Sequence, residues 1–174
     1  LLLETKLKEQ AHATDILSLY VAIIKQKIIE KKFDLVLPLL NIANDAAQLH
    51  PSLLLEVQNL KLKLFLAKYQ RSNYLVSLDQ IQTQANKNIH LSEQLLSSAF
   101  FLTDTLFFQQ VLQCYEQAIE VYYIHYNRTK NIRYADKAFL LVDTYKEIQK
   151  KHFFYQKIKD SPSDSITVFF DDLL

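Results

Sequence analysis

The stretch "AIEVYYIHYNRTKNIRYADKAF", residues 118–139, decides the fold. Its apolar and aromatic residues recur at the three- and four-residue spacing of an amphipathic α-helix. A short polar break interrupts the pattern, and Asn131-Ile132-Arg133 then opens the last long helix. No side chain in the stretch carries an obvious chemistry. We therefore interpret it as a structural joint between helices of a helical repeat array.

The absence of glycine from the 174 residues is the strongest compositional signal. Glycine normally supplies positive-φ turns, hairpin turns and the loops that approach phosphates. A Rossmann fingerprint, a P-loop and a nucleophile elbow are therefore excluded. The chain has only three prolines and is rich in leucine, lysine and glutamine, so long helices are favoured. The composition predicts an all-α fold.

The charge balance excludes a general attraction to polyanions. The chain has 20 basic and 19 acidic residues and a formal net charge of +1, which gives no steering toward nucleic acid or anionic membranes. No apolar run reaches the roughly 20 residues that span a bilayer, and no segment resembles a signal peptide. We expect a cytoplasmic protein with no membrane association. Because the chain begins "LLLETK" and contains no methionine, we interpret it as a fragment of a longer protein.

Apolar stripes repeat along the chain. The first residues of three stripes, Phe33, Tyr74 and Tyr115, lie 41 positions apart. A period near 40 residues is typical of arrays with one helix pair per repeat. We predict a right-handed α-solenoid of seven or eight helices in antiparallel pairs, with an irregular helical bundle as the alternative. Residues 1–158 form the repeat domain, and residues 159–174 form a linker and a short tail.

The pattern also predicts helix boundaries. Helices are expected at 16–29, 33–52, 53–69, 74–87 and 91–108, with Ser92 as the N-cap of the last of these. The His50-Pro51 step ends the second helix, because a residue before proline avoids the α region. That helix should turn one stripe toward its neighbours: Phe33, Leu37, Leu40, Ala43 and Ala47.

Residues 115–150 carry a family resemblance. A long helix ends in tyrosines, "TKN" follows, and a tyrosine and "KAF" come next. This order resembles the tetratricopeptide-repeat regions of bacterial proteins, which often precede a caspase-like CHAT peptidase domain. The resemblance implies a TPR-like helical repeat protein. It implies no catalytic residue here, because Cys114, His125 and His152 do not match the cysteine and histidine of such a peptidase.

The residues with reactive side chains predict no enzyme. Cys114, the only cysteine, lies in an apolar helix and is interpreted as a buried structural thiol. The five histidines form neither an HxxxH pair nor an HExxH motif, so we predict no metal site and no cofactor. Asp171 and Asp172 are interpreted as solvated charges in the tail. Residues 146–159 alternate lysines with Phe153 and Phe154, and we expect the lysines in water and the aromatics in the core, and no nucleic-acid site.

The predicted function is protein–protein recognition. Stacked helix pairs create a concave groove, lined by the first helix of each pair, that can hold a peptide or a partner helix. The candidate groove residues are polar side chains on helices interpreted as first helices: Gln58, Asn59, Lys61, Gln94 and Ser98. Two alternatives stay open. The chain could be the regulatory or sensor region of a larger enzyme such as a CHAT-type peptidase, or a receptor module for a peptide or small ligand.

Overall fold

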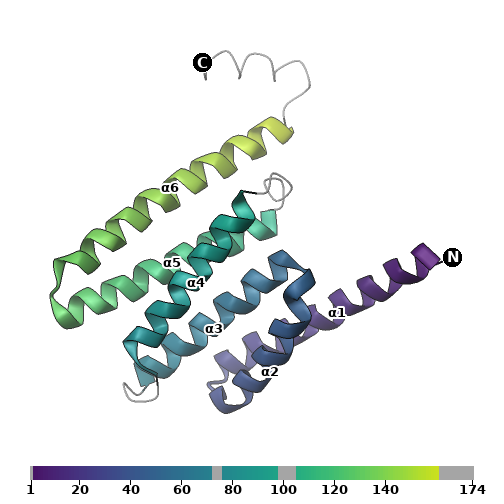
Figure 1. Cartoon of the computed structure of the whole chain (residues 1–174), viewed down its shortest axis with the longest axis horizontal. Helices are drawn as coiled ribbons and strands as arrows, with labels where there is room; N and C mark the ends of the chain where they lie inside the picture. Colours follow the sequence, from purple (N-terminus) through teal and green to yellow (C-terminus); the bar gives the residue numbers. More distant parts are fainter. Residues whose placement is uncertain (1, 72–75, 98–104, 161–174) are drawn as a thin grey trace.

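A computed structural model describes residues 2–71, 76–97 and 105–160 (Figure 1). Across these ranges the chain is helical and contains no strand, as the composition predicts. None of the helices described is long and apolar enough to cross a bilayer. The described elements are six α-helices and one 3₁₀ turn: α1 (Leu2–Ile29), α2 (Phe33–Ala46), η1 (Ala47–Leu49), α3 (Pro51–Arg71), α4 (Leu78–Leu96), α5 (Thr105–Thr129) and α6 (Ile132–Asp160).

The number of helices is lower than the seven or eight predicted, because α4 is continuous where a break was expected. The segment between 87 and 91 is polar but contains neither glycine nor proline. Ser92 is therefore not an N-cap. It is buried inside α4, and its hydroxyl donates to the carbonyl oxygen of Ile89 at 2.7 Å. The actual N-cap is Ser77, which forms a capping box with Gln80.

Each helix packs against the next one in the chain, and α3 also packs against α1 and α5. Helix α3 therefore lies beside both α1 and α5 (Figure 1). Helices α2, α4 and α6 begin at Phe33, Leu78 and Ile132, at intervals of 45 and 54 residues. Neither interval equals the 41 residues predicted from the apolar stripes. Tyr115, the first residue of the third predicted stripe, lies in the middle of α5 and not near the start of a helix as Phe33 does.

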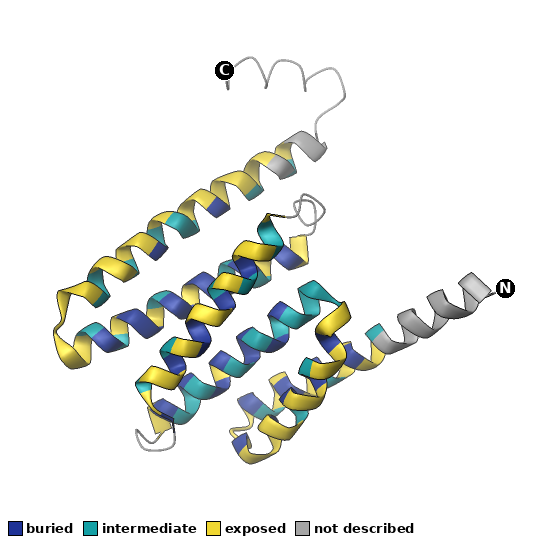
Figure 2. Ribbon diagram, viewed as in Figure 1, coloured by how far each residue is buried: buried dark blue, intermediate teal, exposed yellow. Residues whose placement is uncertain are grey.

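Helix α3 is the centre of the fold, because it is buried on two sides. Val57, Leu60 and Leu64 belong to a core shared with α1 and α2. Leu62 and Leu66 belong to a second core shared with α4, α5 and α6. Figure 2 shows the resulting concentration of buried residues along α3 and α5. A helix that is apolar on two sides is expected to have neighbours on both of them. The face of α3 that remains is polar, and it is described below.

The stripe predicted for residues 33–47 is largely confirmed. Phe33, Leu40, Ala43 and Ala47 are buried. Leu37 is not: its side chain is 38% exposed, and Val36 is buried in its place.

The ends of the helices follow local sequence signals. Pro51 is the first residue of α3, a position where its missing N–H costs nothing, so the predicted break at His50 is confirmed. Asn131 precedes α6 and accepts a hydrogen bond from the backbone N–H of Arg133 at 3.1 Å. Helix α6 runs to Asp160 and so includes the first two residues of the predicted linker. The remaining linker and the tail, with Asp171 and Asp172, lie outside the described residues.

Two helices end on lysines in the left-handed region, where glycine is normally preferred. Lys31 has φ 58° and Lys130 has φ 54°. After α1, the N–H of Lys32 donates to the carbonyl of Lys27 and the N–H of Lys31 donates to that of Ile28, both at 3.0 Å. These are the two bonds of a Schellman motif. The motif therefore forms here without glycine, at a cost in backbone energy.

Lys31→Gly is therefore expected to stabilise the protein, by about 0.5–1 kcal/mol, because glycine adopts positive φ without a Cβ clash. The free energy of unfolding in urea measures this. Lys32→Gly is the matched control, since Lys32 has φ −87°. Glycine there adds flexibility to the unfolded chain and removes the exposed ion pair with Glu30. We expect a destabilisation of about 0.5–1 kcal/mol. Equal effects of the two substitutions would contradict the explanation.

Candidate functional site

A groove runs along the polar face of α3, between the end of α1 and α5. It consists of three adjoining cavities of about 570, 690 and 340 Å³. The first two share Lys31, Phe33 and Arg71, and the last two share Ile28, Ala67 and Gln70. We call this continuous depression the α3 groove. Its floor includes apolar side chains, Ile28 and Leu66 among them.

The sequence places the groove residues of α3 on one face. Lys63, Ala67 and Gln70 have the i, i+4, i+7 spacing of residues that share a helix face. The small Ala67 leaves room between α1 and α5. Two cations in the last turn of α3, Lys68 and Arg71, extend this face to the end of the helix.

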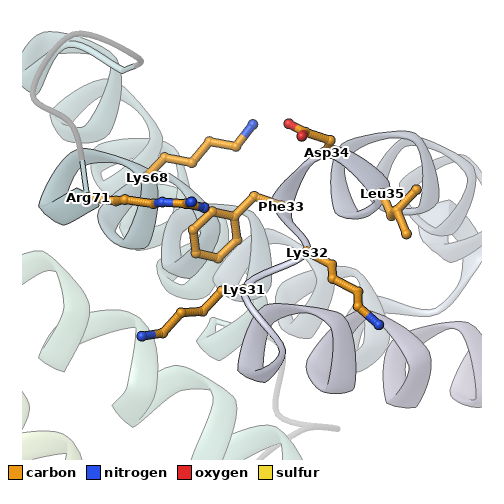
Figure 3. Close-up of a pocket in the computed structure, with 7 residues that line it drawn as sticks. All are labelled: Lys31, Lys32, Phe33, Asp34, Leu35, Lys68 and Arg71. Carbon is orange, nitrogen blue, oxygen red and sulfur yellow. The ribbon is translucent and has the colours of Figure 1, made fainter.

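One end of the groove is basic. Lys31, Lys68 and Arg71 lie around the ring of Phe33, and Lys32 also lines the cavity (Figure 3). Lys32 forms an ion pair with Glu30 at 2.8 Å, whereas Lys31, Lys68 and Arg71 form no ion pair with any described residue. Lys31 stands at this position although its φ of 58° would favour glycine.

Glu30 lines the second cavity beside Lys31 and Arg71 and is strongly stabilised as a carboxylate. Hydrogen bonds from Lys32, Gln26 and Lys27 lower its pKa to about 2. Its charge is therefore present throughout the physiological pH range, and it neutralises Lys32. Asp34 is the carboxylate that lines the first cavity, and in Figure 3 the end of the Lys68 side chain lies toward it. Three unpaired cations against one carboxylate leave the basic end positively charged.

The other end of the groove is acidic. Glu116, Gln117 and Glu120 of α5 face Lys63 of α3 across the third cavity. The Gln70 amide donates to a Glu120 carboxylate oxygen at 3.5 Å, a weak bond. The Tyr145 hydroxyl of α6 donates to Glu116 at 2.8 Å, and this bond raises the pKa of Tyr145. The groove therefore has opposite charges at its two ends.

The described residues that the sequence predicted to bind a partner do not line this groove. Lys61 lies beside a separate shallow hollow of about 340 Å³, with its ammonium 6.0 Å from the Phe65 ring centre. Gln94 is exposed on α4, and its amide is 3.1 Å from His90. Ser98 lies outside the described residues. The periodicity did not show which face of α3 is open.

Gln58 and Asn59 belong to a network of side-chain amides inside the protein. The Gln58 amide donates to Asn44 of α2, and its oxygen accepts from Gln84 of α4 at 2.8 Å. Asn59 is completely buried, and its amide donates to the carbonyl oxygen of Gln110 in α5 at 2.8 Å. Asn59 is therefore inaccessible to a partner, and we correct its assignment to a structural role.

The same network links α3 to α4. Asn88 is also completely buried, and its amide donates to the Asn59 oxygen at 3.3 Å. Gln84 completes the connection by donating to the Asn88 oxygen at 2.8 Å. Buried amides of this kind fix the relative position of helices only when their hydrogen bonds are made.

The residues considered for catalysis are held in structural positions. Cys114 is buried, as predicted, and burial raises its pKa to about 12, so it is a neutral thiol. His125 is also buried; its Nε2 lies 3.2 Å from the Leu78 carbonyl oxygen, and its ring stacks on Tyr134. Within the described residues, no three His, Cys, Asp or Glu side chains are grouped to hold a metal ion.

The aromatic residues near the end of α6 differ from expectation. Phe153 and Phe154 are 57% and 47% exposed, so the prediction that they lie in the core is wrong. The ammonium of Lys157 lies 4.8 Å from the Phe153 ring centre. The helical period explains the exposure. Ile148 is buried, and the residue four positions later on the same face of α6 is His152. Phe153 and Phe154 therefore lie on other faces of the helix.

Comparison with known proteins gives no relative. No family model matches the chain, and neither the curated proteins nor the solved structures contain a match to it. The resemblance to tetratricopeptide-repeat regions therefore rests on residues 115–150 alone.

Proposed function

We propose that this chain is a protein–protein interaction module that binds a segment of a partner protein in the α3 groove. Its helix pairs are those of a right-handed, TPR-like array, in which the first helices line a concave surface. The packing of α1, α3 and α5 side by side supports this arrangement. The groove lies along these helices, where such arrays receive their ligands.

One observation carries the proposal: the basic end holds three cations that have no ion-pair partner in the described chain. They flank the partly apolar continuation of the groove along Ile28 and Ala67. A bound segment with acidic residues would supply counter-charges, and apolar side chains would cover the floor. Charge complementarity of this kind steers association and fixes the register of the bound segment.

The test begins with random 12-residue peptides displayed on phage and selected on the purified protein. Binders are then synthesised, and their dissociation constants are measured by fluorescence anisotropy. Gln70 is the residue to change, because it is exposed and lines both the second and the third cavity. Gln70→Trp is expected to weaken binding at least tenfold by filling the groove, which corresponds to about 1.4 kcal/mol.

Gln109→Trp is the matched control, because Gln109 is exposed on α5 and lines none of the three cavities. Its dissociation constants should stay within about twofold of the wild-type values, since a surface change outside the groove removes no contact. Peptides that bind both variants equally well, or a library that gives no binder at all, would overturn the proposed function.

A further inference from the structure

The acidic end of the groove contains a buried polar atom without a partner. Gln117 of α5 is 8% exposed, and its Oε1 accepts no hydrogen bond from any described residue. Buried polar atoms are nearly always hydrogen-bonded, so such an exception needs an explanation. Gln117 is one of the residues that line the third cavity, so a group bound in that cavity lies next to this residue.

The charges around Gln117 favour a positively charged group. Glu116 and Glu120, on either side of it in sequence, line the same cavity. Their existing contacts, from Tyr145 and Gln70, use one oxygen of each carboxylate and are hydrogen bonds without charge neutralisation. Lys63 on the facing wall is exposed, so its ammonium can remain in water at the end of a flexible stem. Two carboxylates against one lysine leave an excess of negative charge.

We propose that the third cavity is a subsite for a lysine or arginine side chain of the bound partner segment. The side chain donates a hydrogen bond to Gln117 Oε1 and forms an ion pair with Glu120. The cavity, at about 340 Å³, has room for an ammonium or guanidinium group with part of its stem. This subsite rests on the proposed function, because the side chain must belong to a segment lying in the α3 groove.

The spacing of the two charged ends defines the partner sequence further. Lys63 and Arg71 are eight residues apart on α3, which corresponds to about 12 Å along the helix axis. An extended segment covers this distance with about four residues. The expected partner therefore carries a basic residue about four positions from an acidic one, with the acidic residue beside Lys68 and Arg71.

The test uses the 12-residue peptides selected by phage display on the wild-type protein. Binders that are sensitive to Gln70→Trp should carry lysine or arginine about four positions from aspartate or glutamate. Replacing that lysine by norleucine, which keeps the stem and removes the charge, should weaken binding about tenfold. Gln117→Met should weaken the lysine peptide to a similar degree and leave the norleucine peptide unchanged.

Two further variants determine what Gln117 contributes. Gln117→Glu keeps an acceptor and adds negative charge, so it should bind the lysine peptide at least as tightly as the wild type does. Gln109→Met is the matched control on the same helix, and it should bind both peptides as the wild type does. Thermal unfolding of each variant confirms that it is folded before its affinity is compared.

The outcomes separate the subsite from the groove itself. If the Gln70→Trp-sensitive peptides bind equally well with lysine and with norleucine, the subsite is overturned and the groove function stands. A loss of affinity in Gln117→Glu equal to that in Gln117→Met also overturns the subsite, since the Gln117 side chain would then act as a donor through its amide N–H and not as an acceptor through Oε1. If no selected peptide is sensitive to Gln70→Trp, the groove function fails and the subsite fails with it.

Discussion

Replacing Tyr115 by alanine is expected to lower the free energy of unfolding by about 4 kcal/mol, because loss of a buried aromatic ring leaves a large cavity. Tyr115 is 1% exposed and is the largest of the fully buried side chains in the described chain. It lies in the core that α3, α4, α5 and α6 share. A loss of this size is a large fraction of the roughly 5–15 kcal/mol that stabilises an ordinary domain.

Two controls separate the ring from its hydroxyl and from its helix. Tyr115→Phe keeps the ring and removes only the hydroxyl, which is buried and has its pKa raised to about 12. We expect a cost of about 1 kcal/mol for this change. Tyr123→Ala, on the same helix, removes a ring that is 60% exposed and should cost about 0.5 kcal/mol or less. Urea unfolding curves give all three values, and a Tyr115→Ala cost near that of Tyr123→Ala would contradict the packing.

The sequence predicts the all-α class and most of the helices because its signals for them are local. The absence of glycine, the scarcity of proline and the three- and four-residue apolar spacing all favour helix, and Pro51 and Asn131 act within one turn. The predicted break between residues 87 and 91, inside α4, is wrong because the prediction used only the local apolar pattern. Its buried side carries Gln84, Asn88 and Ser92, so the apolar pattern fades where the helix continues. A polar residue on a buried face resembles a surface residue until its partners are known.

The groove was less predictable, because it is made by residues distant in sequence. Lys31, Lys68 and Arg71 come from the end of α1 and the end of α3, and Glu120 comes from α5. In the sequence, each of these charged residues looks like an ordinary solvent-exposed residue. The available signal was the small Ala67 between Lys63 and Gln70 on a helix whose other faces are apolar. A small residue on the polar face of a buried helix indicates where a groove can form.

Asn59→Leu is the second substitution with a large expected effect, a destabilisation of about 3 kcal/mol. The Asn59 amide donates to the Gln110 carbonyl oxygen at 2.8 Å, and its oxygen accepts from Asn88 at 3.3 Å. Leucine has a similar volume but removes both bonds, and it leaves the completely buried Asn88 amide without this acceptor. An unsatisfied buried group costs about 1–3 kcal/mol. Urea unfolding measures the change. Asn41→Leu, at an exposed position on α2, is the matched control and should cost about 0.5 kcal/mol or less.

A double-mutant cycle with Asn88→Leu identifies the cause of the loss. If the cost of Asn59→Leu arises partly from the stranded amide of Asn88, removing that amide as well recovers part of it, because two apolar partners leave no unsatisfied group between them. We expect the double variant to be at least 1 kcal/mol more stable than the sum of the single costs predicts. Strict additivity would mean that the 3.3 Å bond contributes nothing. The amide network would then link α3 to α4 through the Gln84–Gln58 hydrogen bond and not through Asn59 and Asn88.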